Sequence, residues 1–174
     1  MTTAIPASTN MQINYSSNPT PFGICLLAVS AQQICWLSLH DEQLTECAIT
    51  TLLTKNFPAA NFSYAPTPIN PLITSIFTSP DQLPNFAVQL AGTPFQKQVW
   101  HQLQEIPAGT TVSYSTIAQQ LGRPRAVRAV ARAIAQNKIA LLIPCHRVIS
   151  KSGAIHNYRW GKARKQQLLS WEQV

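Results

Sequence analysis

The sequence predicts an α/β fold in two parts, a small α/β unit followed by a mostly helical one. Two apolar runs with the length of buried strands occupy residues 23–29 and 34–39, and amphipathic helical patterns dominate after Gly92. A chain of 174 residues with 45% hydrophobic residues is long enough to bury a core. We therefore expect an α/β domain over residues 1–91 and a second domain over residues 92–174.

The first part is expected to hold a hairpin, a helix and an irregular connection. The first ten to twenty residues are polar and predicted to be loose. The runs GICLLAV and ICWLSL predict two strands joined by the turn at residues 30–33, and residues 41–57 predict a helix with acids in its first turn. Six prolines between residues 58 and 84 predict an irregular connection, with a short helix near residues 72–77 and a strand near residues 86–90.

The second part is predicted to form three helices, whose ends are marked by capping residues and glycine. Thr93 is a good cap and Pro94 a good first residue for a helix that ends at residues 106–109. Ser113 is placed to cap a short helix over residues 114–121, which Gly122 would end. A second helix is predicted over residues 126–136, directly after this turn.

The helix over residues 126–136 has one apolar and one basic side. The apolar positions have the spacing i, i+3, i+4, i+7 and are Val127, Val130, Ala131 and Ile134. The outward side chains are expected to be Arg125, Arg128, Arg132, Ala126, Ala129 and Ala133. Two short helices with a glycine turn and an arginine-lined second helix are typical of a DNA-binding helix-turn-helix, with an ordinary solvated helix as the alternative.

The charge distribution is uneven along the chain. Residues 1–90 hold one base and four acids, a charge of −3, whereas residues 91–174 hold twelve bases and two acids, a charge of +10. Such a division indicates that the second part faces a polyanion, unless it is simply a solvated basic surface. No apolar run approaches the ~18 residues of a membrane span, and the first residues lack a signal-peptide pattern. We expect a cytoplasmic monomer that does not contact a membrane.

Of the four cysteines, Cys145 has the surroundings of a nucleophile. It follows the apolar run 139–143, predicted as a buried strand or extended segment, and precedes His146 and Arg147. Positive charge and a general base favour the reactive thiolate, although a lone cysteine is also commonly a core residue. On an extended chain neighbouring side chains point apart, so His146 needs a turn or a water to act on Cys145. A zinc site from Cys25, Cys35, His40 and Cys47 matches no familiar spacing, and we expect no metal and no cofactor.

Several ordered motifs resemble the O6-alkylguanine-DNA alkyltransferases, also called methylated-DNA–protein-cysteine methyltransferases. The similarity runs from about Gly92 to Glu172 and is most like the C-terminal domain of bacterial Ada-type proteins. The motifs are PFQKQVW at 94–100, TVSY at 111–114, RAVRAVA at 125–131, NK at 137–138, IPCHRVI at 143–149 and NYRWG at 157–161. The first part resembles, more loosely, the ribonuclease-H-like α/β domain that the family carries.

The resemblance implies a role for each matching residue. Cys145 would accept an alkyl group from O6 of guanine in double-stranded DNA, in one irreversible turnover, with O4-methylthymine as a possible minor substrate. His146 would help to remove the thiol proton through a water, and Glu172 would orient His146. Asn137 would tie the helix-turn-helix to the cysteine segment.

The remaining roles concern the DNA and the flipped base. Tyr114 would neutralise the departing guanine, and Arg128 would fill the gap that the flipped base leaves in the stack. Backbone groups of Cys145 and Val148 would read the guanine edge. Residues expected at the DNA backbone are Ser115, Arg123 and Lys151, and the residue expected at the pocket wall is Arg159.

Four residues leave open questions at this stage. Arg159 stands where some relatives have a small residue, which predicts a narrower pocket that disfavours bulky alkyl groups. Arg132 adds a charge to the arginine helix. Glu172 lies near the end of the chain, where fraying is common. Arg147 is either a pocket residue or an ion-pair partner.

Three other kinds of function fit the sequence less well. A DNA-binding regulator or a non-catalytic damage-recognition protein would leave Cys145 unused, and the non-catalytic branch of the family lacks that cysteine. A cysteine hydrolase would need no basic helix. A complete Ada-type sensor would need a further metal-binding domain, for which we see no room in 174 residues.

Overall fold

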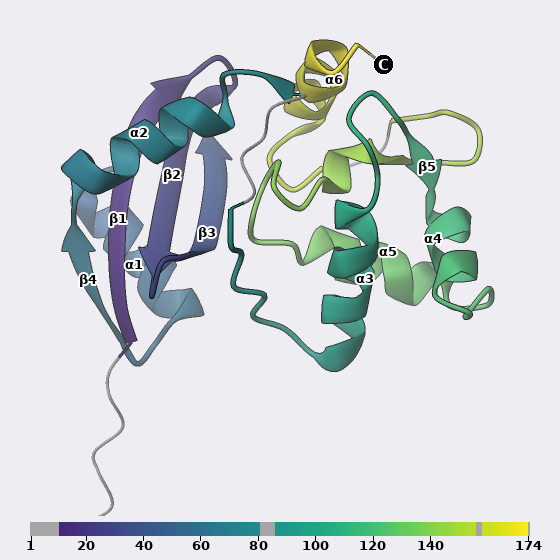
Figure 1. Cartoon of the computed structure of the whole chain (residues 1–174), viewed down its shortest axis with the longest axis horizontal. Helices are drawn as coiled ribbons and strands as arrows, with labels where there is room; N and C mark the ends of the chain where they lie inside the picture. The colour runs from purple at the N-terminus through teal and green to yellow at the C-terminus, as the bar shows by residue number, and fades with distance from the viewer. Residues whose placement is uncertain (1–10, 81–85, 156–157, 174) are drawn as a thin grey trace, which may run out of the picture.

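A four-stranded mixed sheet forms the first half of the molecule. The structure, a computed structural model, describes residues 11–80, 86–155 and 158–173. The strands are β1 (Met11–Thr20), β2 (Gly23–Ser30), β3 (Gln33–His40) and β4 (Ala60–Tyr64), in the spatial order β3-β2-β1-β4 (Figure 1). β1, β2 and β3 form an antiparallel meander, and β4 pairs with β1 in parallel. The predicted hairpin over residues 23–39 is therefore present.

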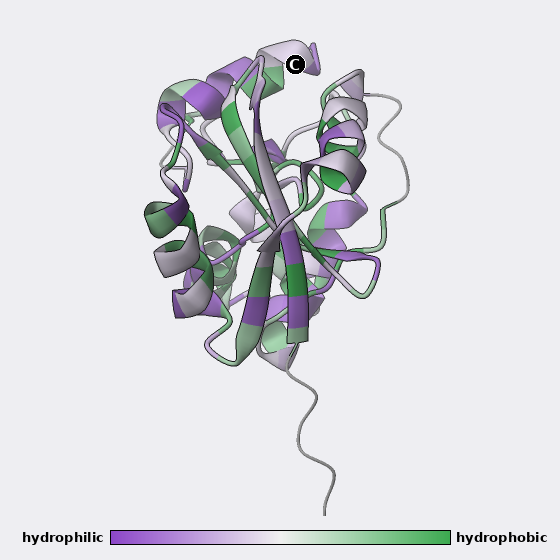
Figure 2. Ribbon diagram, turned by 90° about the vertical axis from the view of Figure 1, so that its left-hand side faces the viewer, coloured by the Kyte–Doolittle hydropathy of each residue, from purple (hydrophilic) through white to green (hydrophobic). Residues whose placement is uncertain are grey.

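Two helices cover opposite faces of this sheet (Figures 1 and 2). They are α1 (Glu46–Asn56) and α2 (Pro66–Ile76). Because side chains alternate along a strand, β2 supplies both faces: Leu26 packs in the cluster of α1, whereas Leu27 packs in the cluster of α2. The sheet is thus buried on both sides, which explains why its strands read as nearly continuous apolar runs.

The second half is mainly helical. Its elements are α3 (Pro94–Gln104), β5 (Val112–Ser113), α4 (Tyr114–Gln120), α5 (Val127–Ala135), the 3-10 turn η2 (Cys145–Arg147), β6 (Val148–Ile149) and α6 (Lys162–Trp171). Thr93 and Gln96 form a capping box at α3, and the Ser113 side chain caps α4. Gly122 adopts φ +67°, a left-handed conformation that suits glycine at the end of a helix. α3, α4 and α5 contact one another, and the three predicted helices of this half are confirmed.

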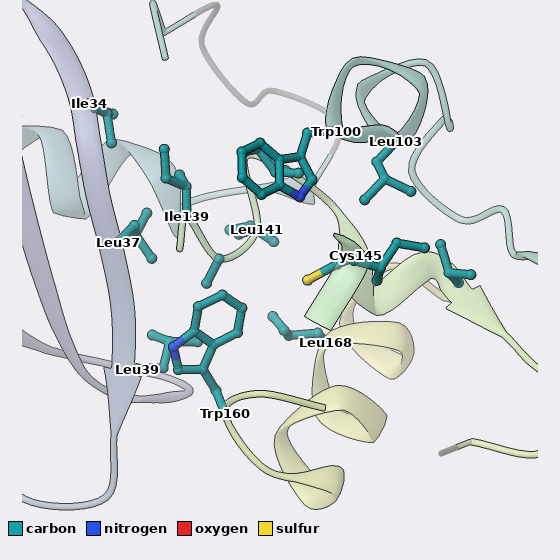
Figure 3. Close-up of a cluster of buried hydrophobic side chains, with 14 of the residues drawn as sticks. Ile34, Leu37, Leu39, Trp100, Leu103, Ile139, Leu141, Cys145, Trp160 and Leu168 are labelled. Atoms are coloured by element: carbon teal, nitrogen blue, oxygen red, sulfur yellow. The ribbon is translucent and has the colours of Figure 1, made fainter. Parts of the chain in front are cut away.

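One hydrophobic cluster joins the two halves. Figure 3 shows Ile34, Leu37 and Leu39 from β3 facing side chains of the helical half, including Trp100, Trp160 and Leu168. The backbone continues this contact, because Leu37 N donates to Lys138 O (3.1 Å) and Ala140 N donates to Leu37 O (2.9 Å). The halves therefore share a core, and the boundary at residues 91 and 92 stays a proposal.

The sequence misplaced several elements of the first half. Residues 11–20, expected to be loose, form β1; residues 1–10 lie outside the described part. α1 begins at Glu46 rather than at residue 41, because the Thr45 side chain caps it by accepting from Ala48 N. Residues 58–80 contain β4, which was not predicted, and α2, which includes most of the helix predicted near residues 72–77 but begins six residues earlier, at Pro66. Pro66 and Pro68 fall in the first turn of α2, where a missing N–H costs nothing.

Two predicted strands are absent as strands. Near residues 86–90 only Val88 bridges to Ile34. Residues 139–143 are largely buried, as expected, but they curl into a turn with Leu141 at φ +63°, and a single bridge joins Ile139 to Leu37. Ala133 is also buried rather than outward, because α3 packs on it and Trp100 Nε1 donates to its carbonyl (2.9 Å). Among the described residues, no helix has the length and apolar character needed to cross a membrane.

Candidate active site

Cys145 opens a short turn at the bottom of a pocket. The turn η2 buries Cys145, His146 and Arg147 together, at 4%, 0% and 5% exposure. The predicted need for a turn between Cys145 and His146 is met by this 3-10 geometry. The Cys145 side chain lies within the hydrophobic cluster that joins the two halves (Figure 3).

Asn137 holds the cysteine segment in place from the end of α5. Its Nδ2 donates to Ile139 O (3.0 Å), Ile143 O (3.0 Å) and Cys145 Sγ (3.1 Å). Its Oδ1 accepts from Ile139 N (2.9 Å). A single buried amide therefore satisfies the backbone of the turn and also reaches the thiol, as the resemblance implied for this residue.

A buried ion-pair network lies on the other side of η2. His146 Nε2 lies 2.9 Å from Glu172 Oε1, and the Arg147 guanidinium donates to both oxygens of Glu172 (2.8–3.2 Å). Arg147 also donates to the carbonyl of Ile106. Arg147 is thus an ion-pair partner and is not among the residues that line the pocket. Glu172, at 5% exposure, is fixed by two partners despite its place near the end of the chain.

The protonation states follow from burial and these contacts. Burial raises the pKa of Cys145, and the Asn137 hydrogen bond and the charge of Lys165 oppose that rise only in part. Burial lowers the pKa of His146 despite its bond to Glu172. Burial alone would raise the pKa of Glu172, but hydrogen bonds from His146 and Arg147 outweigh it and lower the pKa to about 2. At neutral pH the resting site therefore holds a thiol, a neutral imidazole and a carboxylate.

The neutral His146 has one ring nitrogen free. If Nε2–H donates to Glu172, Nδ1 carries the lone pair, and Nδ1 is buried with no hydrogen-bond partner among the described residues. The Tyr158 hydroxyl is likewise buried; among the described residues it makes no hydrogen bond within normal distance and angle, and its nearest polar neighbour is the Cys145 thiol. Burial, followed by this thiol, raises the pKa of Tyr158. Unpaired buried polar atoms are costly, so two of them on residues around Cys145 are consistent with a functional site there.

The pocket above Cys145 has a volume of about 200 Å³. Its walls come from the start of α4, the inner side of α5, the segment before α6, and α6 itself; the residues are Tyr114, Ala131, Ile134, Ala135, Cys145, Tyr158, Arg159 and Lys165. Burial and the neighbouring Cys145 raise the pKa of Tyr114, so its phenol stays protonated. The pocket can accept a partly apolar group, and its lining includes one thiol and two phenols, those of Tyr114 and Tyr158.

Sequence reasoning missed two of these wall residues, Tyr158 and Lys165, as site residues. Lys165 is 1% exposed, lines the pocket and donates through Nζ to Val148 O (2.6 Å). Lys165 lies three and four residues before Leu168 and Leu169, which places it on the apolar side of α6. This spacing could have predicted that Lys165 is buried. Val148 itself is buried and lies outside the pocket lining, with its carbonyl engaged by Lys165.

The residues expected at DNA lie on the surface around the pocket. Arg123, Arg125, Arg128, Arg132 and Lys151 are exposed. The Arg123 guanidinium lies 5.2 Å from the centre of the Phe95 ring. Ser115 is half-buried, and its hydroxyl is 2.8 Å from the Ser113 cap. The exposed side of α5 therefore carries the arginines, next to the pocket that its inner side helps to form.

The other cysteines do not form a second site in the described part of the chain. Cys25 and Cys35 are buried in different hydrophobic clusters, and Cys47 is exposed on α1. No group of three or more potential metal ligands occurs among the described residues.

Comparison with known proteins agrees with this geometry. The family model for the DNA-binding domain of 6-O-methylguanine DNA methyltransferase matches residues 94–174. The crystal structure of the Mycobacterium tuberculosis O6-methylguanine methyltransferase is 34% identical, with a TM-score of 0.73 over 92% of this chain and 93% of that chain. This chain belongs to the O6-alkylguanine-DNA alkyltransferase family. The α/β fold over nearly its whole length is that of the family.

Further relatives show how far the alkyltransferase similarity extends. The bifunctional transcriptional activator/DNA repair enzyme Ada of Escherichia coli is 40% identical over 166 residues, which cover 94% of this chain and 46% of Ada. A second M. tuberculosis structure, in complex with DNA, is 30% identical with a TM-score of 0.71, over 93% of this chain and 92% of that chain. The chain spans about half the length of the curated relatives that it matches.

Proposed function

We propose that this protein repairs O6-alkylated guanine in double-stranded DNA by moving the alkyl group onto Cys145 in a single, irreversible turnover. The observation that carries the proposal is a buried thiol at the floor of a pocket, next in the chain to a His146–Glu172 pair whose free ring nitrogen has no partner in the part of the chain that the structure describes. The family relatives support it, since several are named methylated-DNA–protein-cysteine methyltransferase.

The transfer starts with removal of the thiol proton. Neutral His146 takes this proton through a water at Nδ1, while Glu172 stabilises the imidazolium that forms. The thiolate attacks the alkyl carbon, so that the S–C bond forms as the C–O6 bond breaks. The electron pair passes to guanine, a poor leaving group as an anion, and the Tyr114 hydroxyl supplies a proton to it. His146 then returns a proton to Tyr114.

The product explains why the protein acts once. Cys145 becomes a thioether, which has no easy route back to a thiol. The guanine is restored and remains in the DNA, so no strand break or base removal is needed. No cofactor takes part in these steps.

The target base must leave the duplex before it can reach Cys145. Flipping costs a few kcal/mol and is easier for a poorly paired lesion. We propose that α4 and α5 act as a helix-turn-helix, that Arg128 fills the gap in the stack, and that Ser115, Arg123 and Lys151 contact the DNA backbone. The support is the exposure of the arginines on α5 and the +10 charge of residues 91–174. The backbone of Cys145 would read the guanine edge, together with the Val148 carbonyl, which already accepts from Lys165 and would use its second lone pair.

We also propose further properties of the substrate range, the domains and the oligomeric state. O4-methylthymine is a possible minor substrate. The ribonuclease-H-like relationship of the first half, the domain boundary at residues 91 and 92, the monomeric state and the cytoplasmic location also belong here. One thiol and one arginine helix suffice for one lesion, which favours a monomer.

The proposal is tested by mass spectrometry of the intact protein. The protein is mixed with duplex DNA that carries one O6-methylguanine, and Cys145→Ser is treated in the same way. We expect the wild type to gain the mass of one methyl group, mapped to Cys145, and the variant to gain none. Tight binding without a mass gain would favour the damage-recognition or regulator function instead.

A further inference from the structure

Arg159 forms a wall shared by two cavities. One is the pocket of Cys145, of about 200 Å³, and the other is a groove of about 420 Å³ between β3 and the segment that leads into α6. Trp36 and Trp160 belong to the lining of this groove. A substituent longer than a methyl group, held at Cys145, therefore lies in a pocket that Arg159 lines.

Among the described residues, no carboxylate compensates the charge of Arg159. Its guanidinium lies 5.9 Å from the centre of the Trp36 ring, and no acid pairs with it among the described residues. The one acid of the groove, Asp41, is held by Arg164 at 2.7 Å. Stacking on an aromatic face leaves the hydrogen-bond donors at the edge of a guanidinium free for a ligand.

A second cation lies close to Arg159. The Nζ of Lys138 lies 6.0 Å from the centre of the Phe57 ring, and no acid pairs with it among the described residues. Burial and then the positive charge of Arg159 lower the pKa of Lys138. Lys138 lines neither of the two cavities, so it adds to the positive potential around Arg159 and is not itself expected to contact a group bound there.

We propose that this site accepts O6-alkyl groups that end in a carboxylate, and that Arg159 recognises that carboxylate. The inference rests on the proposed function and narrows its substrate class. It also changes the role expected for Arg159, which would select the charge of the adduct in addition to limiting its size. A planar guanidinium is suited to this because it can donate two parallel hydrogen bonds to a carboxylate.

The reaction with such an adduct follows the same course as methyl transfer. For a carboxymethyl group, the Cys145 thiolate attacks the methylene carbon, the S–C bond forms, and the C–O6 bond breaks with its electron pair going to guanine. Guanine takes a proton, and Cys145 becomes S-carboxymethylcysteine. The carboxylate stays ionised beside Arg159 throughout.

The alternative is that Arg159 binds a DNA phosphate at the mouth of the pocket. In that case its loss would weaken the reaction with every lesion to the same extent. A carboxylate-recognising Arg159 would affect one class of lesion alone. The two roles are therefore separated by a ratio of rates.

The test measures single-turnover rates with three duplexes that differ only in the lesion. They carry O6-carboxymethylguanine, the neutral O6-(carbamoylmethyl)guanine of nearly equal size, and O6-methylguanine. Arg159→Gln is compared with wild type and with Arg132→Gln, which makes the same change on α5. We expect the carboxymethyl to carbamoylmethyl ratio to fall roughly fivefold in Arg159→Gln, as for a partly screened charge pair, and to stay unchanged in Arg132→Gln.

An equal ratio in wild type and Arg159→Gln would overturn the proposal, and a uniform loss on all three duplexes would assign Arg159 to a phosphate. If the wild type transferred methyl but not carboxymethyl groups, the carboxylate proposal alone would fail. If it transferred no group from any duplex, the proposed function would fail and this inference with it.

Discussion

At the scale of single residues, the site depends on a few buried polar groups that each serve several partners. Asn137 is the clearest case, because one amide bonds to the backbone of Ile139 and Ile143 and to the thiol of Cys145. Buried backbone groups without partners are expensive. The position of the nucleophile is therefore tied to the stability of the turn that carries it.

Replacing Asn137 tests this link. Asn137→Ala leaves Ile139 N without its partner and removes one of the two hydrogen bonds that the carbonyls of Ile139 and Ile143 each accept, so we expect the free energy of unfolding to fall by about 2–4 kcal/mol. Urea denaturation measures it, with Gln120→Ala on the exposed side of α4 as a control that changes stability little. A loss below about 1 kcal/mol would show that the turn does not depend on Asn137.

The pH dependence of transfer reports on His146. Because burial lowers the pKa of His146, the imidazole stays neutral, and able to accept a proton, to a pH below its ordinary value of about 6.5. The single-turnover rate on O6-methylguanine DNA should therefore be flat from pH 8 to about 6.5 and fall only at lower pH. An acidic decline centred above pH 7 would contradict His146 as the base.

Several residues of the candidate site could be predicted from the sequence, and others could not. Cys145, His146 and Asn137 were found because their motifs are local in the sequence. The pairing of Arg147 with Glu172 spans 25 residues and depends on how α6 docks, so the sequence left Arg147 undecided. Lys165 was missed because lysines are expected to be exposed, although its spacing on α6 pointed inward.

At the scale of elements, α5 has two chemically different sides with different tasks. Its inner side buries Val130, Ala133 and Ile134, and its exposed side carries Arg128 and Arg132. Under the proposed function, an exposed arginine on α5 would add to DNA binding through phosphate contact, without taking part in the chemistry.

Arg132 provides a test of that separation. Removing one phosphate contact in Arg132→Gln should weaken DNA binding about threefold to tenfold at low salt, and reduce the slope of log affinity against log salt by about one. The transfer rate at saturating DNA should stay unchanged. Lys55→Gln, the same charge change on α1, is the control and should alter neither. An unchanged salt slope in Arg132→Gln would place Arg132 away from the DNA.

Some helices and strands were predicted from sequence patterns, and others were not. Helices with capping residues were placed well, since Thr93 and Ser113 act locally. β4 was missed because a five-residue edge strand among prolines carries little periodicity, and its partner β1 lies some fifty residues earlier. The sequence predicts a buried strand or extended segment over residues 139–143, and the burial is confirmed; the turn was not foreseen because an apolar run does not indicate whether the chain bends.

At the scale of the whole molecule, the two halves are joined by one core and by polar contacts. Beyond the hydrophobic cluster, Arg164 Nε donates to Phe22 O (2.6 Å) and Nη2 to Asp41 (2.7 Å), which links α6 to the sheet. Through these contacts the sheet supports the segment that carries Cys145. Leu37 is central to this support, since its backbone bonds to Lys138 and Ala140.

Leu37→Ala should therefore affect the whole molecule. Leu37 is fully buried, and its truncation should cost about 2–5 kcal/mol through the cavity that remains. Because the core is shared, circular dichroism and tryptophan fluorescence should report one coincident unfolding transition in the variant and in the wild type. Two separate transitions would instead support independent domains on either side of residue 91.

The stoichiometry of transfer is the most direct measure of the central claim. The protein is incubated with increasing amounts of O6-methylguanine duplex until the lesion is in large excess, and repaired guanine is counted per protein molecule. We predict that repair stops at one equivalent, because the Cys145 thioether cannot return to a thiol. Continued turnover beyond one equivalent, or no repair at any excess of DNA, would contradict a protein that is consumed by a single transfer.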